Sequence, residues 1–370
     1  MTTFSKFDHQ MMSRAISLAK GGIYTTAPNP NVGCVLVKNG AIIGEGFHYR
    51  AGEPHAEVHA LRMAGEKAEG ATAYVTLEPC SHYGRTPPCA EGLIKAKVAK
   101  VICAMQDPNP QVAGRGIQML RDAGIDVAVG LLEPDAEALN PAFIKRMKTG
   151  MPYVQLKMAA SLDGQTALSN GQSKWITSSH ARQDVQAFRA QAGSILSTSK
   201  TVIEDNASLN VRWDDLPPSI QQQIPQAQLR QPTRIILDRT NQLSTYPELK
   251  FHQAEGTQLV LSEHGEIPCT IGEDGSIDLE KAMFTLAQQH NINHIWVEAG
   301  ATLASSLLKA NLVDEIVLYQ APKLMGSDGR GLFGAFGLQA MNEVLDLTLL
   351  DVRQIGQDIR IIAKPTKKEN

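Results

Sequence analysis

The sequence predicts an α/β protein built from two domains. With 370 residues, the chain exceeds the roughly 250–300 residues over which a single core usually grows. Apolar, strand-like runs alternate with helical patterns along the chain, which is typical of layered α/β folds. A basic helix end runs into Gly150 and Pro152 before a new strand begins at Tyr153. This join predicts domains 1–148 and 149–370.

The elements of the first half follow in order. Apolar residues recur at helical spacing over residues 8–20 and stop at Gly21-Gly22. Two apolar runs flank Asn39-Gly40, a strong short signal for a β-hairpin. The remaining expected elements alternate between helix and strand, in the order "AEVHALRMAGEKA", "TAYVTL", "AEGLIKAKV", "KVICAM", "GRGIQMLRDAG" and "DVAVGLL".

The second half also alternates strand and helix patterns, but it contains no repeat of the first half's sequence, so the two halves are expected to have different folds. Helices are predicted near 180–191, 279–289 and 302–310, and strands at "RIILD", "QLVLS", "HIWVEAG" and "EIVLYQA". The Pro/Gln-rich insertion 214–232 predicts a surface loop.

Composition narrows the class of protein. The net charge of −3 and the pI near 6.4 favour a protein that acts on small molecules over one that binds a nucleic acid, which usually needs a basic face. No run approaches the ~20 apolar residues that span a bilayer, and the amino terminus is too polar for a signal peptide. We therefore expect a cytoplasmic protein without a membrane partner. Five cysteines predict no disulfide framework.

Four residues predict a catalytic zinc site. His55 precedes a helix, Glu57 lies in its first turn, Cys80 ends a strand-and-turn unit, and Cys89 opens the next helix. One imidazole and two thiolates leave tetrahedral zinc one ligand short, as in catalytic sites that hold water. Zinc lowers the pKa of such a water to about 7, and Glu57 is expected to carry its proton to a leaving amine.

A closed structural zinc in a non-enzymatic scaffold is the alternative, with His59 or His82 as the fourth ligand. We interpret His59 as a non-ligand, because its helical stripe continues to Arg62 and Glu66, which is typical of a solvated face. His82, together with Arg85, better suits a polar loop that meets a charged substrate.

His-Ala-Glu followed by Pro-Cys resembles the zinc-dependent nucleobase deaminases, although eight residues here separate Cys80 from Cys89. The segments "TTAPNPNVGCVLVKNG", "GEPHAEVHAL", "YVTLEPCSHYGRTPPC" and "QDPNPQVAGRG" are similar to the deaminase domain of the bifunctional riboflavin-biosynthesis deaminase–reductases. Four segments of the second half resemble the reductase domain of the same family: "KMAASLDGQTA", "SKWITS", "SLNVRW" and "IWVEAGATLASSLL".

This resemblance implies a cytidine-deaminase-like zinc domain followed by a dihydrofolate-reductase-like domain, with Zn²⁺ and NADPH as cofactors. It implies deamination of a phosphorylated aminopyrimidine and then reduction of its ribosyl chain to ribityl. We also expect a homo-oligomer. The alternative is a nucleoside or tRNA deaminase whose second domain binds substrate without reducing it.

The resemblance also implies roles for deaminase residues. His55, Cys80 and Cys89 become the zinc ligands and Glu57 the proton carrier. Asn29 would present its amide to the pyrimidine edge, or else form an Asx turn before Pro30. Arg85 would contact the phosphate or the substrate, with an ordinary surface position as the alternative.

In the second half, no G-x-G-x-x-G follows a strand, so a standard Rossmann site is not predicted. Instead an apolar strand runs through Gly300 into a helix, where residues 301–306 are expected to supply free amides for a cofactor phosphate. By resemblance the NADPH site is lined by Ala159, Trp175, Thr201, Asp205, Arg239, Gly300, Ala301, Thr302, Leu303, Ala304, Ser305 and Ser306. The substrate site is lined by Ser173, Arg189, Leu209, Arg212 and Glu298.

Guanidinium groups suit a sugar phosphate, which explains Arg189 and Arg212 in that set. The alternatives are a solvated helical position for Arg189 and a core position for Trp175. Lys157 and Asp163 are further candidate site residues.

Overall fold

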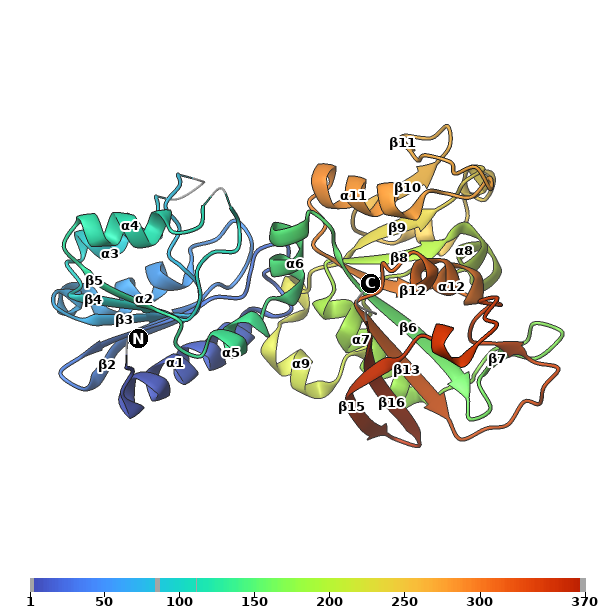
Figure 1. The fold of residues 1–370 in the computed structure, drawn as a ribbon, viewed down its shortest axis with the longest axis horizontal. Helices are drawn as coiled ribbons and strands as arrows, with labels where there is room; N and C mark the ends of the chain where they lie inside the picture. Colours follow the sequence, from blue (N-terminus) through green and yellow to red (C-terminus); the bar gives the residue numbers. More distant parts are fainter. Residues whose placement is uncertain (1–2, 84–86, 111, 367–370) are drawn as a thin grey trace. The chain divides into compact units, whose positions relative to one another are not determined.

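The chain forms two compact units, residues 1–150 and 151–370, in a computed structural model that describes residues 3–83, 87–110 and 112–366 (Figure 1). Each unit has its own sheet with helices on both faces, and the two sheets differ in size and topology. The α/β class and the dissimilar halves are thus confirmed. Within the described ranges, every helix is too short or too polar to cross a membrane.

The first unit is built on a five-stranded sheet in the order β2-β1-β3-β4-β5. Strand β1 runs antiparallel to β2 and β3, whereas β3, β4 and β5 are parallel. The elements are α1 (Lys6–Ala19), β1 (Gly33–Lys38), β2 (Ala41–Phe47), α2 (Ala56–Ala64), β3 (Thr72–Val75), α3 (Cys89–Lys95), β4 (Lys100–Cys103), α4 (Arg115–Asp122), β5 (Asp126–Val129), α5 (Glu133–Glu137) and α6 (Pro141–Thr149).

Alternation along the strands produces two cores in this unit. In β1, Cys34 and Leu36 face one side, and Val35 and Val37 face the other, because successive side chains of a strand point to opposite faces. Helices α2, α3 and α4 cover the first face, and α1, α5 and α6 cover the second. The predicted hairpin at Asn39-Gly40 is confirmed, since both residues have positive φ (52° and 76°), as a type I′ turn requires.

Helix α2 packs directly on strand β2. A Cβ at Gly46 would lie 2.5 Å from the Cβ of His59 and 3.0 Å from the carbonyl oxygen of Ala56. Only glycine leaves room for the helix at this distance. The contact places the amino-terminal turn of α2, with His55 and Glu57, at the end of the sheet.

The second unit contains a nine-stranded sheet in the order β11-β10-β9-β8-β12-β6-β13-β16-β15 and a small sheet of β14 and β7. Its helices are α7 (Ser179–Gln191), α8 (Ser199–Asp205), α9 (Pro218–Gln223), α10 (Lys250–Gln253), α11 (Leu279–Gln289) and α12 (Ala301–Lys309). Its strands are β6 (Tyr153–Ser161), β7 (Gln165–Ala167), β8 (Ser194–Thr198), β9 (Thr233–Leu237), β10 (Gln258–Ser262), β11 (Ile267–Pro268), β12 (His294–Glu298), β13 (Glu315–Ala321), β14 (Arg330–Gly331), β15 (Leu347–Ile355) and β16 (Asp358–Pro365).

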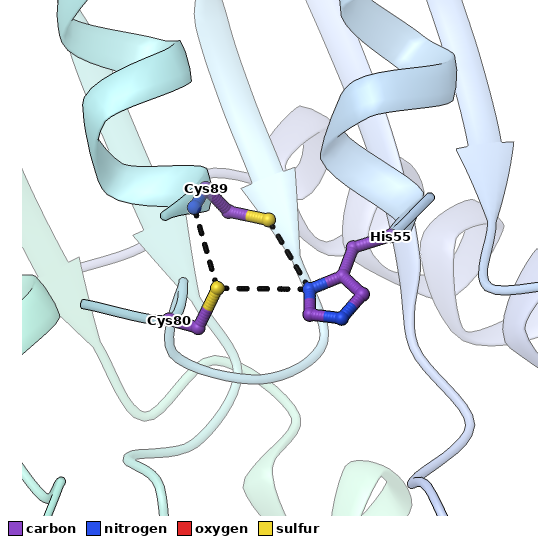
Figure 2. Close-up of side chains that lie close together, drawn as sticks. All are labelled: His55, Cys80 and Cys89. Atoms are coloured by element: carbon purple, nitrogen blue, oxygen red, sulfur yellow. Dashed lines mark hydrogen bonds between the residues drawn. The ribbon is translucent and has the colours of Figure 1, made fainter. Parts of the chain in front are cut away.

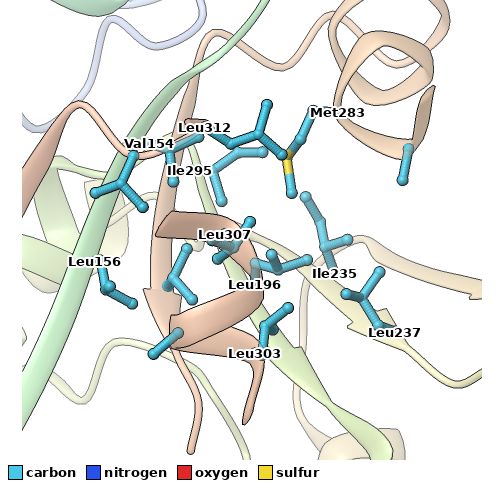
Figure 3. Packing of buried hydrophobic residues seen from close by; sticks show 14 of the residues in the cluster. Val154, Leu156, Leu196, Ile235, Leu237, Met283, Ile295, Leu303, Leu307 and Leu312 are labelled. Carbon is cyan, nitrogen blue, oxygen red and sulfur yellow. The ribbon is translucent and has the colours of Figure 1, made fainter. Parts of the chain in front are cut away.

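The larger core of this unit lies between the sheet and helices α11 and α12. Figure 3 shows Leu196 and Ile235 of neighbouring strands meeting Leu303 and Leu307 of α12. On the opposite face, Ile195 and Ile236 pack with residues of α7, α8 and α10. The central strands β8, β9, β12 and β6 are parallel, so their carboxyl ends share one edge of the sheet.

The insertion 214–232 is not the simple surface loop that its composition predicts. It contains helix α9, and Leu216, Ile220 and Ile224 are buried. Three apolar side chains spaced four residues apart anchor a stretch whose glutamines otherwise face outward, and such sparse spacing is hard to distinguish from loop sequence.

Candidate active sites

The predicted zinc ligands come together in the first unit (Figure 2). His55 is the residue that precedes α2, Cys89 is the first residue of α3, and Cys80 follows the turn after β3. The Nδ1 atom of His55 lies 3.6 Å from the Sγ of Cys80 and 3.3 Å from the Sγ of Cys89. All three ligand atoms lie within 4.8 Å of one another.

This geometry fits zinc. Bonds of about 2.0–2.3 Å in a tetrahedral site separate ligand atoms by about 3.5 Å, close to the two distances above. The backbone N–H of Cys89 has no acceptor within its own helix, because Cys89 is the first helical residue. It donates instead to the Sγ of Cys80 at 3.3 Å, at the positive end of the helix dipole. Hydrogen bonds from the Cys89 thiol and from His55 lower the pKa of Cys80, so that this sulfur is readily a thiolate.

Glu57 lies beside the three ligands without belonging to their group. Its side chain is buried, and its Oε2 atom has no hydrogen-bond partner among the described residues. Burial, followed by the negative Cys80 sulfur, raises the pKa of Glu57 to about 7. A buried carboxyl group with one unused oxygen next to a metal site has the chemistry needed to accept and return a proton.

Neither candidate for a fourth ligand joins the group. The ring of His59 packs edge-on against Tyr49 with centroids 4.7 Å apart, and its Nε2 atom is buried, so the expected solvated face is wrong at this residue. Strand β2 covers this side of α2, which the helical pattern alone does not reveal. His82 is exposed. Arg85 lies outside the described residues.

Sequence reasoning missed His48, which packs edge-on against His55 with centroids 5.2 Å apart. Its Nδ1 donates to the carbonyl oxygen of Pro54 at 3.2 Å, so its Nε2 accepts the hydrogen bond from the Nδ2 of Asn29 at 3.1 Å. Burial lowers the pKa of His48, which keeps the ring neutral. The structure thus brings Asn29 beside the metal group. The sequence signal that could have pointed to this residue is the presence of a second histidine seven positions before His55.

Glu78, also missed, fixes the segment that leads to Cys80. Its buried carboxylate accepts four backbone N–H bonds at 2.9–3.2 Å, two at each oxygen. The donors are Asp107, Gly114, Gly116 and Ile117. They include the first turn of α4, where a carboxylate is favoured by the helix dipole.

In the second unit, the candidate residues gather at the carboxyl edge of the parallel strands. Ala159 is near the end of β6, Glu298 ends β12, and Thr201 follows β8 at the start of α8. Gly300 and Arg239 follow β12 and β9. Ligands of open α/β sheets bind at this edge, so the arrangement suits a cofactor site.

Arg189 and Glu298 form a buried ion pair. The Nε and Nη2 atoms of Arg189 lie 2.6 and 2.8 Å from the two carboxylate oxygens of Glu298. The solvated alternative for Arg189 is therefore wrong, and its guanidinium is largely engaged within the protein. Although burial opposes ionisation, Arg189 lowers the pKa of Glu298 to about 2. Lys157 lies opposite Glu298 in the register of β6 and β12, and burial lowers its pKa.

Helix α12 supplies fewer free amides than expected. The N–H of Ala304 already donates to the carbonyl oxygen of Gly300, which leaves the first-turn amides of Ala301, Thr302 and Leu303 for a ligand. Ser305 is buried, and its Oγ accepts the N–H of Gly334, whereas Ser306 bonds back to Thr302. The expectation that all of 301–306 supply free amides is wrong, because from Ala304 onward each N–H is bonded to a carbonyl oxygen one turn earlier in the helix.

Trp175 is 65% exposed, so the core alternative is wrong. The guanidinium of Arg182 lies 4.4 Å from its ring centroid, and Lys174 pairs with Asp205 at 3.1 Å, which brings the loop of Trp175 to α8. Ser173, in the same loop, is exposed.

The remaining candidates are engaged in different ways. Arg239 donates to the carbonyl oxygen of Gly275 at 2.7 Å, and the exposed Arg212 pairs with Asp215. Asp163 holds a turn, because its carboxylate accepts the N–H groups of Met325 and Gly326. Asp163 follows the carboxyl end of β6, so this turn lies at the same edge of the sheet as the other candidates.

The fold and the two sites define a zinc-dependent deaminase joined to a reductase. Residues 5–105 match the family described as "Cytidine and deoxycytidylate deaminase zinc-binding region", and residues 152–361 match "RibD C-terminal domain". The chain belongs to the RibD family, the bifunctional deaminase–reductases of riboflavin biosynthesis.

Relatives support this assignment over the whole chain. The riboflavin biosynthesis protein RibD of Escherichia coli is 54% identical over 359 residues, covering 95% of this chain and 98% of its own length. That of Haemophilus influenzae is 52% identical, covering 99% of each.

Solved structures agree. Acinetobacter baumannii RibD matches with a TM-score of 0.91 and 49% identity, covering 98% of this chain and 99% of its own. A Thermotoga maritima diaminohydroxyphosphoribosylaminopyrimidine deaminase/5-amino-6-(5-phosphoribosylamino)uracil reductase matches with a TM-score of 0.82 and 32% identity, covering 97% and 99%. A second half that only binds substrate does not agree with these matches.

Proposed function

We propose that this chain carries out two consecutive reactions of riboflavin biosynthesis. The first unit, assigned to 1–148, hydrolyses 2,5-diamino-6-(5-phosphoribosylamino)pyrimidin-4-one to 5-amino-6-(5-phosphoribosylamino)uracil. The second, assigned to 149–370, uses NADPH to reduce the ribosyl group of that product to ribityl. The observation that carries the proposal is the His55–Cys80–Cys89 group beside the buried, half-unpaired carboxyl of Glu57.

In the deaminase unit, His55, Cys80 and Cys89 would hold zinc, which when bound acidifies a water molecule. Glu57 takes a proton from the attacking water and returns it to the exocyclic nitrogen. A carbon–oxygen bond forms at C2, the carbon–nitrogen bond breaks, and ammonia leaves. Asn29 would contact the pyrimidine edge, which its hydrogen bond to His48 supports by fixing the amide.

In the reductase unit, the first-turn amides of α12 and the residues at the carboxyl edge would hold NADPH, which supplies a hydride when bound. Arg189 and Glu298 shape the neighbouring wall, and Lys157 lies opposite Glu298 at this edge. Leu209, Arg212 and Ser173 are proposed to line the substrate side. Catalysis in this unit depends mainly on positioning the two reactants.

The test is to incubate the purified chain with the phosphorylated diaminopyrimidine and NADPH. Ammonia release should precede NADPH oxidation, and omission of NADPH should leave ammonia release unchanged. Oxidation of NADPH without prior ammonia release would contradict the proposed order.

We also infer a homo-oligomer and a cytoplasmic location, the former supported by strand β15. This strand is one of the two edges of the nine-stranded sheet, and Leu347, Leu349 and Leu350 on it are 46–63% exposed. An unpaired edge can pair with another chain, and a group of exposed apolar side chains marks an interaction site. Light scattering of the wild type and of Leu349→Lys tests this, since the variant should show a smaller molar mass.

A further inference from the structure

Residues 208–212, between α8 and the turn at Trp213, are held by side chains from other parts of the second unit. This segment belongs to no strand, so its backbone groups need other partners. Arg234 donates to the carbonyl oxygen of Ser208, Arg189 donates to that of Asn210, and the N–H of Arg212 donates to the Oε1 of Gln186.

Gln231, at the end of the insertion 214–232, binds both backbone groups of Val211. Its Oε1 accepts the N–H of Val211 at 2.8 Å, and its Nε2 donates to the carbonyl oxygen of Val211 at 2.9 Å. The two bonds imitate the pairing that a neighbouring strand would provide. Val211 is buried, so losing them would leave two backbone groups poorly satisfied.

The residue before Gln231 fixes the insertion to the end of helix α7. Arg230 donates from Nη2 to the carbonyl oxygen of Ala192 at 2.6 Å and, more weakly, to that of Ala190. Its guanidinium therefore caps the carboxyl end of the helix that carries Arg189. The backbone at Gln231 is thus a fixed point from which its amide reaches Val211.

The segment adopts a conformation that needs such support. Leu209 has φ of +52° and is 2% exposed, an uncommon backbone state for a branched residue. Asn210, next in the chain, is bonded to Arg189, which also holds Glu298. The side chains of Leu209 and Arg212 therefore take their directions from a backbone fixed at positions 210, 211 and 212.

We propose that Gln231 is a positioning residue that sets the reductase's affinity for its pyrimidine substrate by fixing the backbone between Leu209 and Arg212. This inference rests on the proposed function, which assigns Leu209 and Arg212 to the substrate. It also gives the insertion 214–232 a role: its ordered helix and buried leucine and isoleucines deliver Gln231 to the site.

The test compares Gln231→Ala with Gln222→Ala in the full-length, zinc-loaded enzyme. Gln222 is an exposed glutamine of the same insertion, on α9. The reductase is assayed with the purified deamination product and NADPH, each varied in turn. For Gln231→Ala we expect the KM for the pyrimidine to rise about tenfold, as loss of two net hydrogen bonds allows. The KM for NADPH, the reductase kcat and ammonia release should stay within about twofold, and Gln222→Ala should match the wild type.

An unchanged pyrimidine KM in Gln231→Ala overturns the proposal, and so does an equal loss in both KM values and kcat, which would mark general damage to the unit. If Gln231→Ala does not fold, as judged by near-ultraviolet circular dichroism, Gln231→Glu decides. That variant keeps an acceptor for the Val211 N–H but turns a carboxylate oxygen toward the Val211 carbonyl, so the same selective rise is expected. If the wild type fails to oxidise NADPH with this substrate, the proposed function itself is wrong.

Discussion

At the scale of single residues, the chemistry of the deaminase unit depends on one buried carboxyl group. We expect Glu57→Gln to lower the rate of ammonia release by about 10²–10⁴-fold, because the amide cannot carry a proton. Zinc content should remain near one ion per chain, since Glu57 is not in the ligand group. Reduction of the deaminated product by NADPH should be unchanged and serves as the internal control. Loss of zinc from this variant would instead identify Glu57 as a ligand.

A second residue-scale prediction concerns acid stability. The pKa of Glu298 is about 2 in the folded protein, below its ordinary value, because Arg189 favours the charged form. A carboxyl group whose pKa is lowered on folding stabilises the folded protein at every pH above its pKa in the unfolded chain, which is near 4.5. This stabilisation is lost as the pH falls toward 2. Lowering this pKa from about 4.5 to about 2 corresponds to a contribution on the order of 3 kcal/mol.

This effect is measured by urea denaturation at several pH values between 5 and 3, which gives the free energy of unfolding of the second unit at each pH. Glu298→Gln should be less stable than the wild type at pH 5, since it leaves Arg189 buried without its partner charge. The difference between the two proteins should shrink as the pH falls. A constant difference across the range would show that Glu298 does not titrate as described.

At the scale of secondary-structure elements, the sequence predicted best where a local pattern and the final packing agree. The hairpin at Asn39-Gly40 and helices α2, α3 and α7 follow from turn residues and from apolar spacing that the fold buries. Strands β15 and β16 were not predicted. Strand β15 is an edge with exposed leucines, so its pattern lacks the alternation that marks a half-buried strand.

The candidate sites show the same division. His55, Cys80 and Cys89 were predictable because metal chemistry restricts residue type and each ligand lies at a recognisable element boundary. Glu78 and Gln231 could not be predicted, because they bind backbone groups 20 or more residues away. Every residue type has a backbone, so the sequence does not identify such a partner. Long-range backbone contacts require the fold before they can be seen.

Helix α2 provides an element-scale prediction, because its contact with β2 sets the position of His55 and Glu57. We expect Gly46→Ala to destabilise the first unit by about 1–3 kcal/mol, the usual cost of overpacking, and to lower ammonia release. Gly92→Ala is the matched control. Its Cβ would meet the nearest atom, the Cδ1 of Leu61, at an ordinary 3.6 Å, and alanine favours helix α3, so equal or greater stability is expected. Thermal denaturation of both variants makes the comparison, and equal destabilisation would contradict the account.

At the scale of the whole molecule, each unit has its own sheet, its own cores and its own site. Removing zinc should therefore stop only one reaction. A strong chelator should abolish ammonia release, whereas NADPH oxidation with purified deaminated substrate should continue at the original rate. Zinc added back should restore the first reaction. If chelation stopped both, the reductase would depend on the metal-holding unit in a way that its separate core does not indicate.

The same independence predicts that two chains, each defective in one unit, complement one another. Glu57→Gln lacks the proton carrier, and Arg212→Ala lacks a proposed substrate contact, so its reductase KM should rise strongly while its deamination stays intact. Mixed in equal amounts and given the diaminopyrimidine with NADPH, the two variants should together form the ribityl product, because one releases the uracil intermediate and the other reduces it. The rate should show a lag that shortens as the enzyme concentration increases, since the intermediate must accumulate in solution. Each variant alone, at the same total concentration and low substrate, is the control. Absence of product from the mixture, with both single activities intact, would mean that the intermediate does not pass between chains.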